Sequence, residues 1–181
     1  MRGVLGEREV GAVLGDLGRL GYIVRHDIQC ENQQTGARWN IDHLVIGPSG
    51  VYVVETKWRA KAEKGNRIAF DGERVRIGDG PWDAEPIRQV RANADWVRQR
   101  LAGAGMADVP VRGMVCYPGW WVDEIGPVSD VVVINPKRVF GRVEGMEAVL
   151  DERRVREVAE VIGGFASRES PEKPTDQKSL V

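Results

Sequence analysis

The chain has 181 residues, with 26 lysines and arginines, 27 aspartates and glutamates, and a formal net charge of −1 at pH 7. Hydrophobic residues make up 42% and charged residues 29%, which is the composition of an ordinary globular protein with a sizeable core. These values argue against a disordered chain and against a strongly basic nucleic-acid-binding protein, and no apolar run approaches the roughly 18 residues that span a bilayer.

The segment over residues 1–7 lacks the apolar region of a secretory signal, and Cys30 and Cys116 show neither a metal-binding nor a redox spacing. We therefore expect both thiols to be reduced and partly buried. A cytoplasmic protein without a membrane partner is the interpretation that follows.

The first predicted element is a helix over residues 6–20, which Gly21 ends. Its apolar face consists of Val10, Val13, Leu14 and Leu17. Glu7 precedes this face by one turn and extends it with a carboxylate, as an acid beside a metal-binding cleft would. A first-turn acid that interacts with the helix dipole explains Glu7 equally well, so both interpretations stay open. A strand over residues 22–28 follows.

Residues 40–57 form two apolar runs joined by Gly47-Pro48-Ser49-Gly50, which predicts a β-hairpin. Folding the segment about the middle of this turn sets Gly47 opposite Gly50, Val45 opposite Tyr52, and Asp42 opposite Glu55. Strand alternation then puts Lys57 on the same face as Glu55. Two carboxylates and an ammonium group are thus expected together on one face of an apolar hairpin.

Like charges opposite each other destabilise a sheet, and burial among apolar side chains penalises ionised carboxylates. A divalent cation removes both costs, and magnesium in particular binds one or two carboxylates together with water and phosphate. A solvated ion cluster at the end of the sheet explains Asp42, Glu55 and Lys57 without a metal, so the residues alone leave both readings open. Alternation directs His43 to the opposite face, where we expect a packed or hydrogen-bonded histidine.

Basic residues follow the hairpin and recur in the next helix. They are Lys57, Arg59, Lys61, Lys64, Arg67, Arg88, Arg91, Arg98 and Arg100. A basic rim around an acidic pocket would suit a phosphodiester backbone. Solvated faces of a strand and a helix explain the same residues.

The Asp71-Gly72 pair predicts a two-residue turn between strands over residues 67–70 and 73–77, which we place as an accessory hairpin at the edge of the sheet. A helix begins near Pro86. Its core face consists of Ile87, Val90, Ala94, Val97 and Leu101. A polar and aromatic stripe beside that face consists of Gln89, Asn93 and Trp96.

Two more strands are predicted over residues 111–117 and 130–134, separated by an aromatic loop, Pro118-Gly119-Trp120-Trp121, that we expect to be exposed. The last helix is predicted over residues 152–162. Residues 166–181 are polar and contain prolines, which is typical of a disordered tail. Residues 1–165 are therefore expected to form one domain.

The pattern of Asp42, a hairpin turn and Glu55-Thr56-Lys57 resembles the motif of the PD-(D/E)XK superfamily of metal-dependent nucleases. More narrowly, the chain is similar to a NERD (nuclease-related) domain. The matching pieces are Gly6-Glu7-Arg8-Glu9-Val10, Ile41-Asp42-His43, Val45 through Gly50, Val53 through Lys57, and Pro86-Ile87-Arg88-Gln89. The resemblance extends to about Leu101, and one departure is Asn40-Ile41 before Asp42, where the superfamily often has a proline.

The resemblance implies a restriction-endonuclease-like α/β/α fold with a central mixed sheet. It implies Asp42, Glu55 and the backbone carbonyl of Thr56 as metal ligands, and Lys57 as the residue that positions the attacking water. Glu7 would be the helical acid near the metal, and Gln89 a polar residue at the rim of the cleft.

The function that the resemblance implies is hydrolysis of phosphodiester bonds, in DNA first of all, with Mg²⁺ or Mn²⁺ as cofactor. The alternative is a non-catalytic module of the same fold that binds nucleic acid or a protein. A homodimer would let one site per chain cut two strands, although no residue in the sequence requires it.

Overall fold

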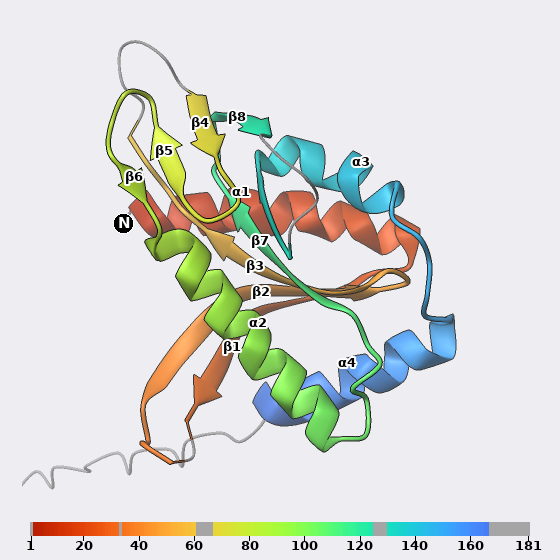
Figure 1. Cartoon of the computed structure of the whole chain (residues 1–181). Helices are drawn as coiled ribbons and strands as arrows, with labels where there is room; N and C mark the ends of the chain where they lie inside the picture. Colours follow the sequence, from red (N-terminus) through yellow and green to blue (C-terminus); the bar gives the residue numbers. More distant parts are fainter. Residues whose placement is uncertain (1, 33, 61–66, 125–129, 167–181) are drawn as a thin grey trace, which may run out of the picture.

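The computed structural model describes residues 2–32, 34–60, 67–124 and 130–166 (Figure 1). Its helices are α1 (Arg2–Gly15), α2 (Glu85–Gly103), α3 (Val139–Glu144) and α4 (Glu152–Ala166), with 3-10 helices η1 (Asp16–Leu20) and η2 (Pro136–Arg138). Its strands are β1 (Ile23–Glu31), β2 (Arg38–Gly47), β3 (Gly50–Thr56), β4 (Arg67–Phe70), β5 (Val75–Ile77), β6 (Trp82–Asp83), β7 (Val111–Cys116), β8 (Trp121–Glu124) and β9 (Val131–Ile134).

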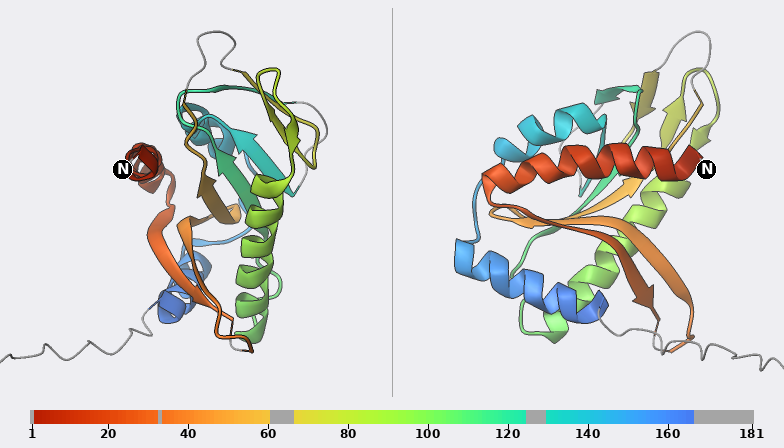
Figure 2. Two further views of the ribbon diagram at one scale, coloured as in Figure 1. Left: turned by 90° about the vertical axis from the view of Figure 1, so that its left-hand side faces the viewer. Right: turned by 180° about the vertical axis from the view of Figure 1, so that it is seen from behind.

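The central sheet has the strand order β1-β2-β3-β7-β9. Strands β1, β2 and β3 are antiparallel neighbours, whereas β7 is parallel to both β3 and β9, so the sheet is mixed. Helices α1 and α3 lie on one face of the sheet, and α2 and α4 lie on the other (Figures 1 and 2). This α/β arrangement, a mixed sheet flanked by helices, is consistent with the fold class that the sequence predicted.

The two faces of the sheet carry separate apolar cores. The core under α2 and α4 includes Leu44, Ile46, Val51, Val53, Ile87, Val90, Val97, Leu101, Val155, Val158 and Ile162. The core under α1 and α3 includes Val10, Leu14, Leu17, Val45, Tyr52, Val54, Met114, Val139 and Val143. Because successive residues of β2 and β3 alternate between these cores, the hairpin is apolar on both faces, as a strand in the middle of a three-layer protein should be.

The register of the β2–β3 hairpin agrees with the predicted one, since Gly47 pairs with Gly50 and Val45 with Tyr52. Both glycines are required by their surroundings. A Cβ atom on Gly47 would overlap the ring of Tyr22, and Gly50 has a φ of 113° and lies against the carbonyl of Pro110. The turn is therefore held in one register, because no other residue fits at either position.

The ladder between β1 and β2 is interrupted where Asp27 faces Asp42. The pairs His26–His43 and Ile28–Ile41 flank this point, and Asp27 itself has a φ of 52°. His43 lies on the α1 side, where its Nδ1 is 2.8 Å from Nδ1 of His26, whereas Ile28 and Ile41 belong to the core under α2. Side-chain alternation thus shifts at this point in both strands, although the pairing register is the same before and after the interruption.

The segment after β3 differs from the sequence prediction. Strands β4 and β5 form the expected hairpin, but they belong to a second sheet of order β6-β5-β4-β8, in which β4 pairs in parallel with β8. The accessory hairpin is therefore not an edge of the main sheet. Phe70 pairs with Val75, so the connection has four residues rather than two, and the Asp71 carboxylate closes it by accepting from the backbone N–H groups of Glu73 and Arg74.

The predicted exposed aromatic loop is only half exposed. Trp121 is 58% exposed, but Trp120 is buried and its indole N–H donates to the carbonyl oxygen of Arg59. Both cysteines are buried and free, as expected. The predicted last helix continues to Ala166, and the predicted disordered tail falls on residues 167–181, outside the described residues. Within the described ranges, no helix has the length and apolarity that crossing a membrane requires.

Candidate active site

Four of the predicted site residues converge where β3 leaves the main sheet. Asp42 is in β2 beside its interruption, Glu55 is near the end of β3, and Lys57 follows that strand. Gln89 is in the first turns of α2, which packs across β3 and β7. The ladder between β2 and β3 ends at the His43–Val54 pair, and one further step in the same register brings Asp42 beside Glu55.

Glu55, Lys57 and Gln89 form a closed hydrogen-bonded triangle. The Lys57 ammonium donates to Glu55 Oε1 at 2.9 Å and to Gln89 Oε1 at 2.7 Å, and Gln89 Nε2 donates to Glu55 Oε1 at 2.8 Å. Glu55 is only 4% exposed. Its other carboxylate oxygen, Oε2, is buried and has no hydrogen-bond partner among the described residues. One oxygen of Glu55 is thus fixed by the protein, while the second still has its hydrogen-bonding capacity.

Asp42 is held in an unfavourable electrostatic environment. Its Oδ2 accepts a hydrogen bond of 2.7 Å from the backbone N–H of Thr56. Burial, then the charge of Glu55, and more weakly that of Glu7, raise its pKa to about 6, against the opposing effects of Thr56 and Lys57. Two interacting acids in a partly buried place, one of them with a raised pKa, are typical of cation-binding and proton-transferring sites.

Glu7 lies near this cluster but outside the hydrogen-bonded triangle. It is an exposed residue of α1, and its charge acts on Asp42 through space. The preceding Gly6 packs against Trp58 and Thr56, where a Cβ atom would come within 3.1 Å of the Trp58 ring. Close packing of α1 on the end of β3 therefore brings Glu7 toward the acids.

The donor set is compatible with a hard divalent ion such as Mg²⁺ or Mn²⁺. The two carboxylates supply oxygen ligands, and the buried Oε2 of Glu55 is an acceptor without a hydrogen-bond partner among the described residues. In the described ranges, no group of three or more His, Cys, Asp or Glu side chains could hold a metal ion. Further ligands would therefore have to be a backbone carbonyl, such as that of Thr56, water, or phosphate.

The predicted basic rim is largely neutralised by acids. Ion pairs link Arg67 to Asp123, Arg88 to Glu85, Arg98 to Asp95, and Arg91 to both Glu73 and Asp130. Lys61 and Lys64 lie outside the described residues. Within the described ranges, the basic side chain that bonds directly to an acid of the candidate site is Lys57, whose ammonium donates to Glu55.

Sequence reasoning missed one feature beside the site, which is the geometry of Asp27. Its carboxylate accepts a 2.6 Å hydrogen bond from Nδ2 of Asn40, across the interrupted ladder. An aspartate tolerates a positive φ better than most residues, but nothing in the sequence around Asp27 indicates that the strand pairing is interrupted there.

Comparison with protein families gives a match that covers more than half of the chain. The model of a family described as nuclease-related domain, NERD, matches residues 2–118. No curated protein matches the chain. A crystal structure described as that of a protein of unknown function, AF1548, is 10% identical with a TM-score of 0.39, and the alignment covers 87% of this chain and 66% of that one.

Proposed function

Because the chain belongs to the NERD (nuclease-related domain) family, we propose that it is a metal-dependent nuclease that hydrolyses phosphodiester bonds in DNA. The observation that supports this most is the convergence of Asp42, Glu55, Lys57 and Gln89, with one buried oxygen of Glu55 left unpartnered. Such a group of acids is costly to bury unless it binds a cation.

Asp42, Glu55 and the backbone carbonyl of Thr56 would hold Mg²⁺ or Mn²⁺. When bound, such an ion supplies Lewis-acid activation of a water molecule and neutralises charge on the phosphate. The Lys57–Gln89–Glu55 triangle fixes one oxygen of Glu55 and leaves the other without a hydrogen-bond partner among the described residues. This second oxygen could bind an ion without first losing a hydrogen bond.

Lys57 has a second role in this proposal. An ammonium group has three donors, and two of them bond Glu55 and Gln89 in this structure. The third can donate to the attacking water or to a phosphate oxygen, which orients the nucleophile and stabilises developing negative charge.

A non-catalytic module of the same family is the second candidate. The observation in its favour is that Lys57 forms an ion pair with Glu55 at 2.9 Å, as it would in a structural salt bridge. In that case the site would bind neither metal nor the scissile phosphate, and the domain would act by binding nucleic acid or a protein.

The test uses Asp42→Asn, which removes the charge but keeps an oxygen that can accept from Thr56. Calorimetric titration with Mn²⁺ and cleavage of plasmid DNA in Mg²⁺ or Mn²⁺ are measured on the variant and on the wild type. We expect metal binding and cleavage in the wild type, and at least a 100-fold loss of cleavage with weakened binding in the variant, on the scale that loss of one electrostatic stabiliser produces. Equal metal binding by both proteins would contradict the proposal, and absence of both activities in the wild type would favour the non-catalytic module.

A further inference from the structure

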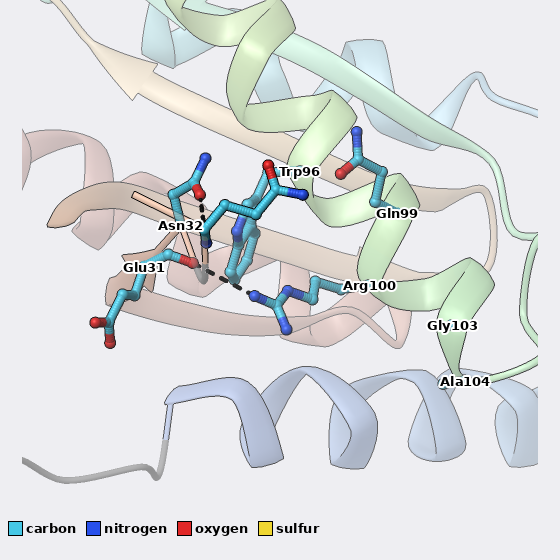
Figure 3. Close-up of a pocket in the computed structure, with 8 residues that line it drawn as sticks. Glu31, Asn32, Trp96, Gln99, Arg100, Gly103 and Ala104 are labelled. Atoms are coloured by element: carbon cyan, nitrogen blue, oxygen red, sulfur yellow. Dashed lines mark hydrogen bonds between the residues drawn. The ribbon is translucent and has the colours of Figure 1, made fainter. Parts of the chain in front are cut away.

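A second concave site lies away from the acids, between the end of β1 and the C-terminal half of α2 (Figure 3). The cavity has a volume of about 540 Å³, within the range of small-molecule sites. Its lining residues are Glu31, Asn32, Gln34, Trp96, Gln99, Arg100, Gly103 and Ala104. Nothing in the proposed hydrolytic chemistry uses this cavity.

The cavity contains a rigid planar group. The Arg100 guanidinium lies over the Trp96 ring at 5.1 Å from its centroid and donates to the backbone carbonyl of Glu31 at 3.4 Å. Trp39 packs edge-on against Trp96 with 6.0 Å between ring centroids, and its own N–H is held by the Asn93 side chain at 3.0 Å. The Trp96 indole is therefore fixed in orientation before any ligand binds. This reduces the conformational entropy that is lost when a planar ligand stacks on it.

The remaining walls are polar but carry little charge. Asn32, Gln34 and Gln99 bring side-chain amides, each of which offers both donors and an acceptor. The Glu31 carboxylate points away from α2 (Figure 3) and lies 3.6 Å from Arg38. Arg100 is the cation of the cavity. The aromatic and guanidinium planes can stack on the face of a nucleobase, and the amides can hydrogen-bond to its edges. Binding of a phosphate would need more positive charge than this cavity has.

A single stripe on α2 joins this cavity to the candidate active site. Gln89, Asn93, Trp96 and Arg100 follow one another at steps of four, three and four residues, so they share one side of the helix. At 1.5 Å per residue, Trp96 and Arg100 lie about 10 Å and 16 Å along the axis from Gln89. A stacked nucleic-acid strand advances 3.4 Å per nucleotide, so these distances correspond to roughly three to five nucleotides.

We propose that this cavity binds a nucleobase of the substrate strand, three to five nucleotides from the phosphate that is cleaved. The proposal rests on the proposed nuclease function and adds a substrate class to it. A base paired within a duplex cannot enter a side pocket without leaving its stack. The preferred substrate is therefore a single strand, or a duplex with an unpaired flank that reaches the cavity.

The test measures binding in the absence of divalent metal, so that no cleavage occurs. Labelled single-stranded DNA of two and of twelve nucleotides, and a free deoxynucleoside monophosphate, are titrated against wild type, Trp96→Leu and Ala104→Phe. The second variant fills the cavity from an exposed position at the end of α2 and leaves the Trp96 packing intact. Arg153→Gln, an exposed change on α4 outside the cavity lining, is the control for a surface substitution that leaves the cavity unchanged.

We expect both cavity variants to bind the twelve-nucleotide strand about 5- to 100-fold more weakly, the range produced by losing one base–aromatic stack, while the control and the dinucleotide change less than twofold. Wild-type affinity in both cavity variants would overturn the proposal. Loss of mononucleotide binding without any change for the long strand would overturn the assignment to the substrate strand and make the cavity a site for free nucleotide.

The result of this binding test can be distinguished from the result of the test of the proposed nuclease function. If the cavity variants lose affinity for the long strand and the wild type shows no metal-dependent cleavage, the cavity stands as a nucleobase site on a non-catalytic module. If cleavage is confirmed but the cavity variants bind and cleave long strands as the wild type does, the nuclease stands and the cavity proposal fails.

Discussion

Replacing Asp42 by asparagine should stabilise the protein at pH 8. The pKa of Asp42 is raised from 3.8 to about 6 in the folded state, chiefly by burial and by the charge of Glu55. The folded protein therefore binds the Asp42 proton more tightly than the unfolded chain does. Between about pH 4 and pH 6 the free energy of unfolding falls as the pH rises, and above pH 6 the ionised carboxylate destabilises the fold by its full amount.

The size of this destabilisation follows from the pKa shift of Asp42. About two pKa units at 1.36 kcal/mol each give roughly 3 kcal/mol, and partial exposure of Asp42 to solvent reduces this to about 2 kcal/mol. Asparagine keeps an acceptor for the Thr56 N–H, so the 2.7 Å hydrogen bond need not be lost. For a chain of this length, about 2 kcal/mol corresponds to a rise in melting temperature of roughly 4–8 °C.

The assay is urea denaturation of wild type and Asp42→Asn at pH 8 and at pH 4, in chelator. We expect the variant to be more stable by about 2 kcal/mol at pH 8 and by less than about 1 kcal/mol at pH 4, where the wild-type carboxyl is already protonated in the folded protein. Asp16→Asn, an exposed acid of η1, is the control. A variant that is no more stable than the wild type at pH 8, or that gains equally at both pH values, would refute the reasoning.

Three other substitutions test the packing around the site by urea denaturation. Lys57→Met should destabilise the protein by about 3 kcal/mol because it leaves the buried charge of Glu55 unpaired, and adding Glu55→Gln should restore much of the lost stability. A double variant whose loss of stability equals the sum of the two single losses would contradict this. Asp27→Val should lose about 1–2 kcal/mol at a positive φ, whereas Asp27→Gly should change stability by less than about 0.5 kcal/mol; equal losses would show that φ is not the cause. Gly47→Ala should lose about 3 kcal/mol or fail to fold because its methyl group would overlap the ring of Tyr22, and near-normal stability would disprove that overlap.

The hairpin that carries the acids could be predicted from sequence because its information is local. The turn is symmetric about Pro48 and Ser49, the flanking residues are apolar on both sides, and the glycines at its ends allow only one register. The approach of Asp42 to Glu55 followed from that register. The position of Gln89 did not, because a helical pattern shows which residues share a face but not where α2 crosses β3. Periodicity placed Gln89 in a polar and aromatic stripe of the helix, but only the resemblance to a family assigned it to the site.

Long-range pairing accounts for most of what the sequence did not predict. Strand β8 joins β4 across a separation of more than fifty residues, and Arg91 meets Asp130 across 39 residues, so no local pattern could show either contact. The interruption at Asp27 depends on two strands that must change their alternation at the same point. Trp120 and Trp121 are adjacent, and only the packed structure shows that one is buried while the other is exposed.

The most direct test of the nuclease assignment is the rate at which the protein nicks supercoiled plasmid. The wild type, Glu55→Gln and Glu85→Gln are compared under identical conditions with Mg²⁺, with Mn²⁺ and with excess chelator. Glu85 is an exposed acid on α2, so its substitution controls for loss of one negative charge near the cleft. We predict metal-dependent nicking by the wild type and Glu85→Gln, and its loss in a folded Glu55→Gln protein. Nicking by Glu55→Gln at the wild-type rate would contradict the assignment of this site.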